Sequence, residues 1–196
     1  MPDEISPDEL AAIVKRAQQG SAADFHALYE LFVKRIYNFI LRLIGSKEDA
    51  EDLTQETFLK VHRELKKLRD PKQFRYWLYR IARNEVYQKL RRTKKVSEIS
   101  LEGEEGPLDW LLADEGMDLH PERAFLSQEL NEIILCALRS LTPKYRDVFV
   151  LAVFQKMKYE EISRIVGRSL LSVKTDIYRA RLVVKDHVKT YLGRQR

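Results

Sequence analysis

The sequence predicts an all-α protein with two small helical domains joined by an acidic, flexible linker. Only 7 glycines and 6 prolines occur among 196 residues, which favours long helices over many short strands. Apolar residues recur at three- and four-residue steps on both sides of the middle of the chain, as they do in amphipathic helices. Between these parts, residues 97–125 are acidic, contain glycine and proline, and show no long period.

The distribution of charge divides the chain at the same places. Residues 1–96 hold 20 basic and 14 acidic side chains, and residues 126–196 hold 14 basic and 7 acidic ones. Residues 97–125 hold 1 basic and 9 acidic side chains, too polar a composition to offset the entropy of ordering. We therefore expect a basic domain at 1–96, an acidic linker at 97–125 and a second basic domain at 126–196.

Capping residues predict the first three helices. Ser6 and Glu9 have the spacing of a capping box at the start of the first helix. Ser21 opens a second helix, whose apolar residues recur at helical spacing until Gly45 ends it. Ser46 can cap a third helix directly afterwards.

The third helix carries an acidic stripe inside an otherwise basic domain. Asp49, Glu51, Asp52 and Glu56 lie on it. Such a surface would repel DNA and suits a basic protein partner. The alternative is a solvated helix start, where acidic side chains interact favourably with the helix dipole.

A fourth helix is predicted over residues 74–92, after a break at Pro71. Its expected buried face consists of Phe74, Leu78, Ile81, Ala82, Val86 and Leu90. A second stripe interleaves rings, guanidinium groups and an amide, at Trp77, Arg80, Asn84, Tyr87 and Arg91. Arginines follow a phosphate backbone, and aromatic faces stack on unpaired bases, so this stripe predicts a surface for single-stranded nucleic acid. The alternative is that Trp77 and one tyrosine belong to the core.

Helical signals return at Leu126. Residues 143–155 predict a buried helix rather than a buried strand, because helical patterns lie on both sides of their apolar run. Two shorter helices then flank Gly167, where a tight turn needs positive φ. This order is typical of a helix-turn-helix, whose second helix enters the major groove of DNA. An ordinary helical hairpin is the alternative.

The composition argues against several classes of protein. The four histidines lie in separate segments, and the sequence offers no metal-ligand spacing, glycine-rich phosphate loop or nucleophile–base arrangement. We therefore expect neither an enzyme nor a cofactor.

Cysteine content and hydropathy predict the compartment. The single Cys136 cannot form an intramolecular disulfide, which indicates a reducing compartment, and its apolar neighbours predict a core position. The longest apolar run, Val148 to Phe154, is too short to span a bilayer, and the N-terminus lacks an apolar signal core. These features predict a cytoplasmic protein that does not insert into a membrane.

Three stretches carry most of these features, namely DAEDLTQETFLKV, FRYWLYRIARNEVYQKLRR, and YEEISRIVG with SVKTDIYRARLVVK. Together they resemble the bacterial sigma factors of the extracytoplasmic-function (ECF) type, within the sigma-seventy family. The resemblance implies a promoter-specificity subunit that binds core RNA polymerase, recognises and melts promoter DNA, and directs initiation. It also implies control by an anti-sigma factor and a role in stress-response genes.

The resemblance and the residue pattern together assign three sets of site residues. The expected core-polymerase-binding residues are Asp49, Glu51, Asp52, Leu53, Gln55 and Glu56. The expected residues for the downstream promoter element and its single strand are Arg69, Lys72, Gln73, Trp77, Arg80, Arg83, Asn84, Tyr87, Arg91 and Arg92. The expected residues for the upstream element are Arg168, Ser172, Lys174, Thr175, Tyr178 and Arg179.

Four residues of the second domain depart from the family pattern. Arg168 follows the turn glycine where the family usually has an apolar residue, and Leu171 replaces a common glycine. Asp176 stands where arginine is usual, which removes one expected phosphate contact, and Ser163 replaces the usual alanine.

Two other functions compete with this interpretation. A stand-alone helix-turn-helix regulator explains the second domain but neither the acidic helix nor the aromatic, basic one. The second is a helical adaptor protein, whose basic faces would bind acidic proteins. It explains the basic faces and no other feature of the sequence. Binding to core polymerase separates all three.

Overall fold

The computed structural model of the chain describes residues 5–97 and 136–193. The expected linker beyond Ser97 and the expected helical start at 126–135 lie outside these ranges. Within the described ranges every regular element is helical, as the sequence predicts.

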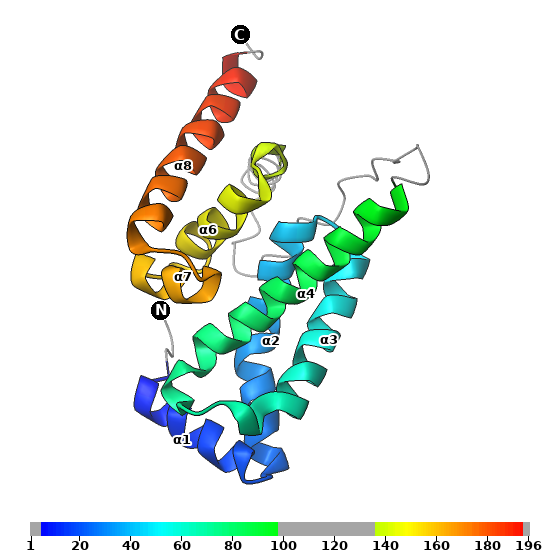
Figure 1. Ribbon diagram of the computed structural model, residues 1–196, viewed down its shortest axis with the longest axis vertical. Coiled ribbons are helices and arrows are strands. Elements are labelled where there is room, and N and C mark those ends of the chain that lie inside the picture. The colour runs from blue at the N-terminus through cyan, green and yellow to red at the C-terminus, as the bar shows by residue number, and fades with distance from the viewer. Residues whose placement is uncertain (1–4, 98–135, 194–196) are drawn as a thin grey trace, which may run out of the picture.

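Residues 5–97, called the first half below, contain four α-helices and two short 3-10 turns. They are α1 (Pro7–Gln18), α2 (Ala22–Ile44), α3 (Lys47–Glu64), η1 (Leu65–Lys67), η2 (Pro71–Gln73) and α4 (Phe74–Ser97). Helices α2, α3 and α4 pack on one another, and α1 packs on α2 at one end of this bundle (Figure 1). The predicted buried face of α4 is confirmed, with Leu90 only partly buried.

The predicted caps of the first half are confirmed. The Ser6 hydroxyl accepts the Glu9 N–H at 3.2 Å, and the Glu9 carboxylate accepts the Ser6 N–H at 2.9 Å. Ser21 and Ser46 cap α2 and α3, and Gly45 ends α2 with φ at 80°. Because each cap involves residues within one turn, the short-range pattern was sufficient to predict it.

The second half contains a helical stretch at 136–140 followed by α6 (Pro143–Val153), α7 (Tyr159–Val166) and α8 (Leu170–Gly193). The apolar run in α6 is helical, as predicted. The expectation of a short last helix is wrong, because α8 has 24 residues. Val173, Ile177 and Ala180 bury its first half, and Val184 continues the contact with the core.

The two halves pack against each other. Helix α6 contacts α2, α7 contacts α4, and α8 covers α6 and α7 (Figure 1). Buried residues from both halves form one continuous hydrophobic core. The described part of the protein is therefore a single body, in which two groups of helices are in direct contact.

Arg146 of α6 reinforces this contact with directional bonds. Its guanidinium donates to the carbonyl of Leu43 in the last turn of α2 at 2.9 Å, and to Leu138 O at 2.8 Å. Two further bonds reach Arg139 O and Leu141 O. One side chain thus satisfies carbonyls that the ends of two helical segments leave without partners.

The expected core position of Cys136 is wrong, because this residue is exposed. Ala137, Leu138 and Leu141 take the buried positions of that segment instead. Among the helices within residues 5–97 and 136–193, none combines the length and apolar character needed to cross a bilayer.

Candidate functional site

A cavity of about 390 Å³ opens beside the start of α4. Four residues of the expected single-strand set line it, namely Arg69, Gln73, Trp77 and Arg80. The other lining residues are Lys67, Leu68, Asp70, Tyr76 and, from α7, Arg164. The volume lies in the range of sites that bind small molecules, and the walls combine flat rings with cationic groups.

The loop between α3 and α4 is held by local and long-range bonds. The Asp70 carboxylate accepts the Lys72 N–H at 3.0 Å and caps η2. The Gln18 amide of α1 donates to the carbonyls of Leu65 and Leu68, at 2.9 and 2.8 Å. These bonds fix the rim of the cavity relative to α1. The Lys72 ammonium itself pairs with Asp8 at 2.8 Å and does not line the cavity.

Trp77 is partly buried. It is therefore neither a fully buried core residue nor a fully exposed one, the two alternatives that the sequence left open. Its ring centroid is 6.2 Å from that of Phe74, which is fully buried, and its side chain also lines the cavity. Tyr76 was not among the site residues predicted from the sequence, although it lies next to Trp77 on α4 and also lines the cavity. The contribution of Arg164 could not be found from local spacing, because it comes from the other half of the chain.

Arg83 and Tyr87 of the expected single-strand set contact the second half instead. The Arg83 Nε donates to Asp147 Oδ2 at 2.7 Å, and the Tyr87 hydroxyl donates to Pro143 O at 2.8 Å. The Arg83 guanidinium also lies over the Tyr87 ring, 4.6 Å from its centroid. Burial raises the pKa of Tyr87, so its hydroxyl remains a neutral donor at physiological pH.

Asp147 is fully buried at this contact between the halves. Burial raises the pKa of its carboxyl, and the nearby charges of Arg83 and Arg168 oppose that rise. Arg168 Nη2 lies 3.3 Å from Asp147 Oδ1, and the Val148 N–H also donates to this carboxylate. The buried carboxylate therefore has partners from α4, from its own helix and from the turn before α8.

Three other members of the single-strand set are exposed away from the cavity. Asn84, Arg91 and Arg92 lie further along α4. Of these, Arg92 lines a groove of about 140 Å³ between α3 and α4, together with Asp52, Glu56 and Lys89. The structure thus places four members of the predicted strand-binding set at the cavity, two at the contact between the halves and one in this groove. The other three, Lys72, Asn84 and Arg91, lie at none of these places.

The acidic stripe on α3 is accessible in part. Glu51, Asp52, Gln55 and Glu56 are exposed. Asp49 pairs with Lys89 of α4 at 2.7 Å. Including Leu53 among the residues that contact a partner is not supported, because only 3% of this residue is exposed. As an apolar residue on the inner face, Leu53 holds the stripe in place rather than presenting itself to a partner.

Helices α7 and α8 form a helix-turn-helix. Gly167 ends α7 with φ at 68°, the left-handed conformation that the sequence predicts. Lys174, Thr175, Tyr178 and Arg179 are exposed on α8, and Ser172 is partly buried. Ser163 closes the turn, because its hydroxyl donates to the Arg168 carbonyl.

The sequence placed Arg168 among the residues that bind the upstream element, but in the structure its side chain points into the protein rather than toward the exposed face of α8. Its guanidinium pairs with the Asp176 carboxylate, donates to Lys144 O at 3.3 Å, and approaches Asp147. Asp176 is only 2% exposed and also pairs with Lys144 at 3.0 Å. Two of the departures from the family pattern are therefore partners in one internal ion pair.

Within the described ranges, no group of three or more His, Cys, Asp or Glu side chains is placed to hold a metal ion. The basic, aromatic surface of α4 and the helix-turn-helix of α7 and α8 define a DNA-binding protein. Residues 28–96 match the family model of Sigma-70 region 2, and residues 131–183 match that of Sigma-70, region 4. The chain belongs to the sigma-70 family, as an ECF sigma factor.

Similar proteins support this membership. The ECF RNA polymerase sigma factor SigE of Mycolicibacterium smegmatis is 31% identical over 93% of this chain and 68% of its own length. RNA polymerase sigma factor YlaC of Bacillus subtilis is 32% identical over 82% of this chain and 90% of its own length. The sigma factor RpoE of Bartonella quintana, solved in complex with the anti-sigma factor NepR, shares the fold with a TM-score of 0.70. It is 24% identical, and the match covers 85% of this chain and 97% of that one.

Membership of this family decides among the three functions considered from the sequence. The protein is a transcription initiation factor, which binds core RNA polymerase and promoter DNA and acts as a promoter-specificity subunit. A stand-alone helix-turn-helix regulator and a helical adaptor protein are thereby set aside.

The pairing of Arg168 with Asp176 predicts strongly coupled effects on stability. Arg168→Leu leaves Asp176 with Lys144 as its remaining partner, and Asp176→Leu leaves Arg168 with Asp147. Each variant loses one charge-assisted bond and should lower the free energy of unfolding by about 2 kcal/mol. The double variant should lose clearly less than the sum, because the bond between the two residues can be lost only once. Urea denaturation followed by circular dichroism measures these changes. Arg181→Leu, at an exposed position of α8, is the control and should change stability by under about 0.5 kcal/mol. Additive losses in the double variant would contradict the pairing.

Proposed function

We propose that this sigma factor opens promoters by capturing unpaired bases of the downstream element in the cavity beside α4. The carrying observation is the cavity itself, where Trp77 and Tyr76 lie among Arg69, Arg80 and Lys67. Aromatic faces stack on bases that have left the helix, and cations follow their phosphates. Such a site favours the melted strand over the closed duplex, whose bases are already stacked.

Magnitudes indicate that the sigma factor does not melt DNA alone. Duplex stacking is about 1.4 kcal/mol per step, so a bubble of about ten steps costs about 14 kcal/mol. A few captured bases at about 1–3 kcal/mol each cannot offset this cost. We propose that core polymerase contributes the remainder and that base capture selects where opening begins.

The acidic stripe on α3 is the proposed contact with core polymerase. Asp52, Gln55 and Glu56 are exposed on one side of the helix, and Leu53 anchors the opposite side. An acidic and amide surface suits a basic protein partner and would not itself bind DNA. We assign Asp49 a smaller share, because Lys89 already pairs with its carboxylate.

Helix α8 is the proposed reader of the upstream element. Lys174, Thr175, Tyr178 and Arg179 are exposed in its first half, where recognition helices contact base edges and phosphates. Ser172 lies beside them at the partly buried edge. Arg168 acts on this surface through Asp176, by orienting the helix.

We also propose regulation by an anti-sigma factor in the cytoplasm, and target genes of a stress response. The RpoE of Bartonella quintana was solved in complex with the anti-sigma factor NepR, which supports a partner of this kind. Co-purification of the full chain from its native cells, followed by mass spectrometry, tests this part of the proposal.

Base capture predicts a specific defect for Trp77→Ala. Removing a stacking ring should lower the equilibrium for open-complex formation about 5- to 150-fold. The measurement is permanganate footprinting of promoter thymines by holoenzyme. On a template already mismatched across the bubble, much of the defect should disappear, because no base pair has to be broken. Trp77→Phe keeps a stacking ring and should retain most of the opening.

A defect of equal size in closed-complex binding, with no relief on the mismatched template, would contradict base capture. Because Trp77 contacts Phe74, the unfolding of both variants is measured in parallel. Only variants whose free energy of unfolding stays near that of the original chain enter the comparison.

The polymerase contact predicts a charge-dependent loss of binding. Asp52→Lys reverses one charge in the proposed surface and should weaken binding to core polymerase at least tenfold, with folding intact. Glu48→Lys is the matched control, since Glu48 is an exposed acid on the same helix outside the proposed set. Titration of labelled sigma factor with core enzyme measures both affinities. Equal affinities for the two variants would argue against the assignment.

A further inference from the structure

We propose that Leu171 contacts the 5-methyl group of a thymine in the upstream element and so helps to set the promoter preference of the protein. The inference rests on the proposed entry of α8 into the major groove. Leu171 lies in the first turn of α8 and is 75% exposed. Val173 and Ile177 are buried on the opposite face of the helix, so Leu171 points away from the core.

The start of α8 holds Leu171 in place. The Ser169 hydroxyl accepts the Ser172 N–H at 3.2 Å, and the Ser169 carbonyl accepts the Val173 N–H at 3.0 Å. The Thr175 hydroxyl donates to the Leu171 carbonyl at 2.9 Å. A side-chain cap and a regular first turn therefore fix the direction of the leucine, as a contact with one particular base requires.

The neighbours of Leu171 on the exposed face suit a surface for DNA. Lys174 is exposed three residues later, and Tyr178, seven residues later, is 64% exposed. Residues at these spacings lie on one side of a helix, so the three side chains form one surface. Lys174 can reach a phosphate or a base edge, whereas the leucine can offer only an apolar contact.

The chemistry of the major groove selects the partner of Leu171. Residues near the start of a recognition helix contact base edges. Thymine is the one standard base that presents a methyl group in the major groove, and apolar side chains contact this group. Single exposed leucines are common on protein surfaces. The position of Leu171 within the proposed contact surface, rather than its exposure alone, therefore carries the assignment.

Uracil tests the methyl contact directly, because it differs from thymine only in lacking that group. The probes are duplexes selected by holoenzyme for the upstream element, with each thymine replaced in turn by uracil. At one position the replacement should weaken binding about fourfold, the value expected for one methyl group. Holoenzyme with Leu171→Ala should bind the thymine duplex about as weakly and should not distinguish the two bases there.

Leu182→Ala is the matched control, since Leu182 is also exposed on α8 but lies three turns beyond Leu171. This variant should distinguish thymine from uracil as the original chain does. Circular dichroism of the full chain verifies the folding of both variants. The methyl contact is overturned if no uracil replacement weakens binding by the original chain, or if Leu171→Ala keeps the full preference for thymine.

Lys174→Ala separates this inference from the proposed role of α8. Removing a cationic contact should weaken binding to both duplexes and keep their ratio. If it does so while no uracil replacement depends on Leu171, the methyl contact is overturned and α8 still reads DNA. If neither variant changes binding, α8 does not enter the groove and the proposed function of this helix fails.

A second inference rests on a different observation, a cavity of about 160 Å³ where α1, α2, α4 and α7 meet. We infer that this cavity binds a small organic anion, whose charged oxygens contact Arg35 and Arg75 and whose short apolar part contacts the rest of the wall. The cavity is distinct from the one proposed for base capture, although Tyr76 lines both. Its volume is below that of sites for drug-sized molecules, so its ligand has to be small.

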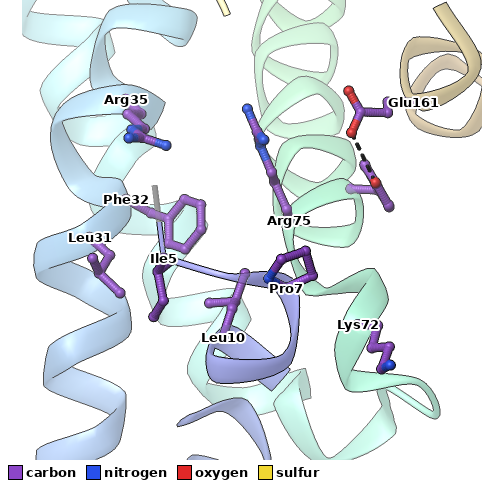
Figure 2. A pocket seen from close by; sticks show the side chains of 10 residues that line it. Ile5, Pro7, Leu10, Leu31, Phe32, Arg35, Lys72, Arg75 and Glu161 are labelled. Carbon is purple, nitrogen blue, oxygen red and sulfur yellow. Dashed lines mark hydrogen bonds between the residues drawn. The ribbon is translucent and has the colours of Figure 1, made fainter. Parts of the chain in front are cut away.

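Two arginines give the cavity its positive charge. Arg35 of α2 and Arg75 of α4 extend toward the space between their helices (Figure 2). Within the described residues the buried Nε of Arg75 has no hydrogen-bond partner, and buried donors of this kind are rare. Burial raises the pKa of Tyr79 to about 12, and the charges of Arg75 and Arg35 oppose that rise, so both guanidinium groups lie near its hydroxyl. Two like charges on one wall repel each other, and an anion relieves the repulsion.

The other charged side chains of the wall already have partners. The Lys72 ammonium pairs with Asp8 at 2.8 Å. The Glu161 carboxylate accepts the Tyr76 hydroxyl at 3.0 Å and the Lys158 N–H at 2.7 Å. Glu161 is therefore not the counter-ion of either arginine.

The remaining wall of the cavity is apolar. It consists of Ile5, Pro7, Leu10, Leu31 and Phe32 (Figure 2). A guanidinium presents a planar fork of donors that matches the two oxygens of a carboxylate. A cationic end and an apolar wall together fit a carboxylate on a short apolar body better than they fit an inorganic ion.

Benzoate is the probe for this cavity, because it joins a carboxylate to one small ring. Ligand-observed NMR titration of the full chain measures its affinity. Benzamide, which has the same shape without the charge, should bind at least tenfold more weakly, and inorganic phosphate, which has no apolar part, should also bind more weakly. Arg75→Met keeps an unbranched stem but removes the charge. It should weaken benzoate binding at least tenfold, the value expected for one charge-assisted hydrogen bond.

Arg35→Met is the second variant, because Arg35 is exposed and its replacement leaves the core intact. It should also weaken benzoate binding. Arg63→Met, at an exposed position of α3 outside the cavity, is the control and should bind benzoate as the original chain does. The inference is overturned if benzoate binds no more tightly than benzamide, or if folded Arg35→Met binds it as the original chain does. Phosphate that binds as tightly as benzoate would overturn the role of the apolar wall.

Discussion

The buried carboxylate of Asp147 is the interaction on which the arrangement of the two halves depends. A carboxylate without access to water must be paired, because leaving it alone costs several kcal/mol. Here Arg83 of α4 and Arg168 from the turn before α8 supply the charges. Apolar burial holds the halves together without fixing their orientation, since the hydrophobic effect is not directional. The ion pairs add that direction and set α4, α6 and the helix-turn-helix relative to one another.

This arrangement gives α4 two partners that exclude each other. The guanidinium of Arg83 has a fixed fork of donors, so it cannot pair with Asp147 and follow a phosphate backbone with the same Nε. The same holds for the hydroxyl of Tyr87, which already donates its hydrogen bond to Pro143 O. The unusual mixture of rings and cations along α4 is thus consistent with two tasks. In this structure it matches the polar edge of α6 and α7, and in the proposed function it meets a nucleic-acid strand.

What could be predicted from the sequence depended on the range of the interaction. The caps at Ser6 and Gly45 and the turn at Gly167 are determined within a few residues, and they were predicted correctly. The internal pairing of Arg168 was not predictable in this way, because Asp176 lies two turns further along α8 and Asp147 lies on α6. Leu53 shows a different limit. Two exposed acids, Glu51 and Asp52, precede it in the sequence, but its apolar character places it on the inner face. Burial therefore overrides its place in the motif.

The pair of Arg168 and Asp176 also changes how α8 would bind DNA. An acidic residue on a recognition helix would repel phosphates if it were exposed, but Asp176 is buried and neutralised by Arg168 and Lys144. The ion pair connects the turn after α7 to α8. Binding then lacks one cationic phosphate contact, which contributes about 0.9 to the salt-dependence slope of duplex binding. Recognition of the upstream element should therefore depend less on salt, and more on direct contacts to base edges, than it would with an exposed arginine at position 176.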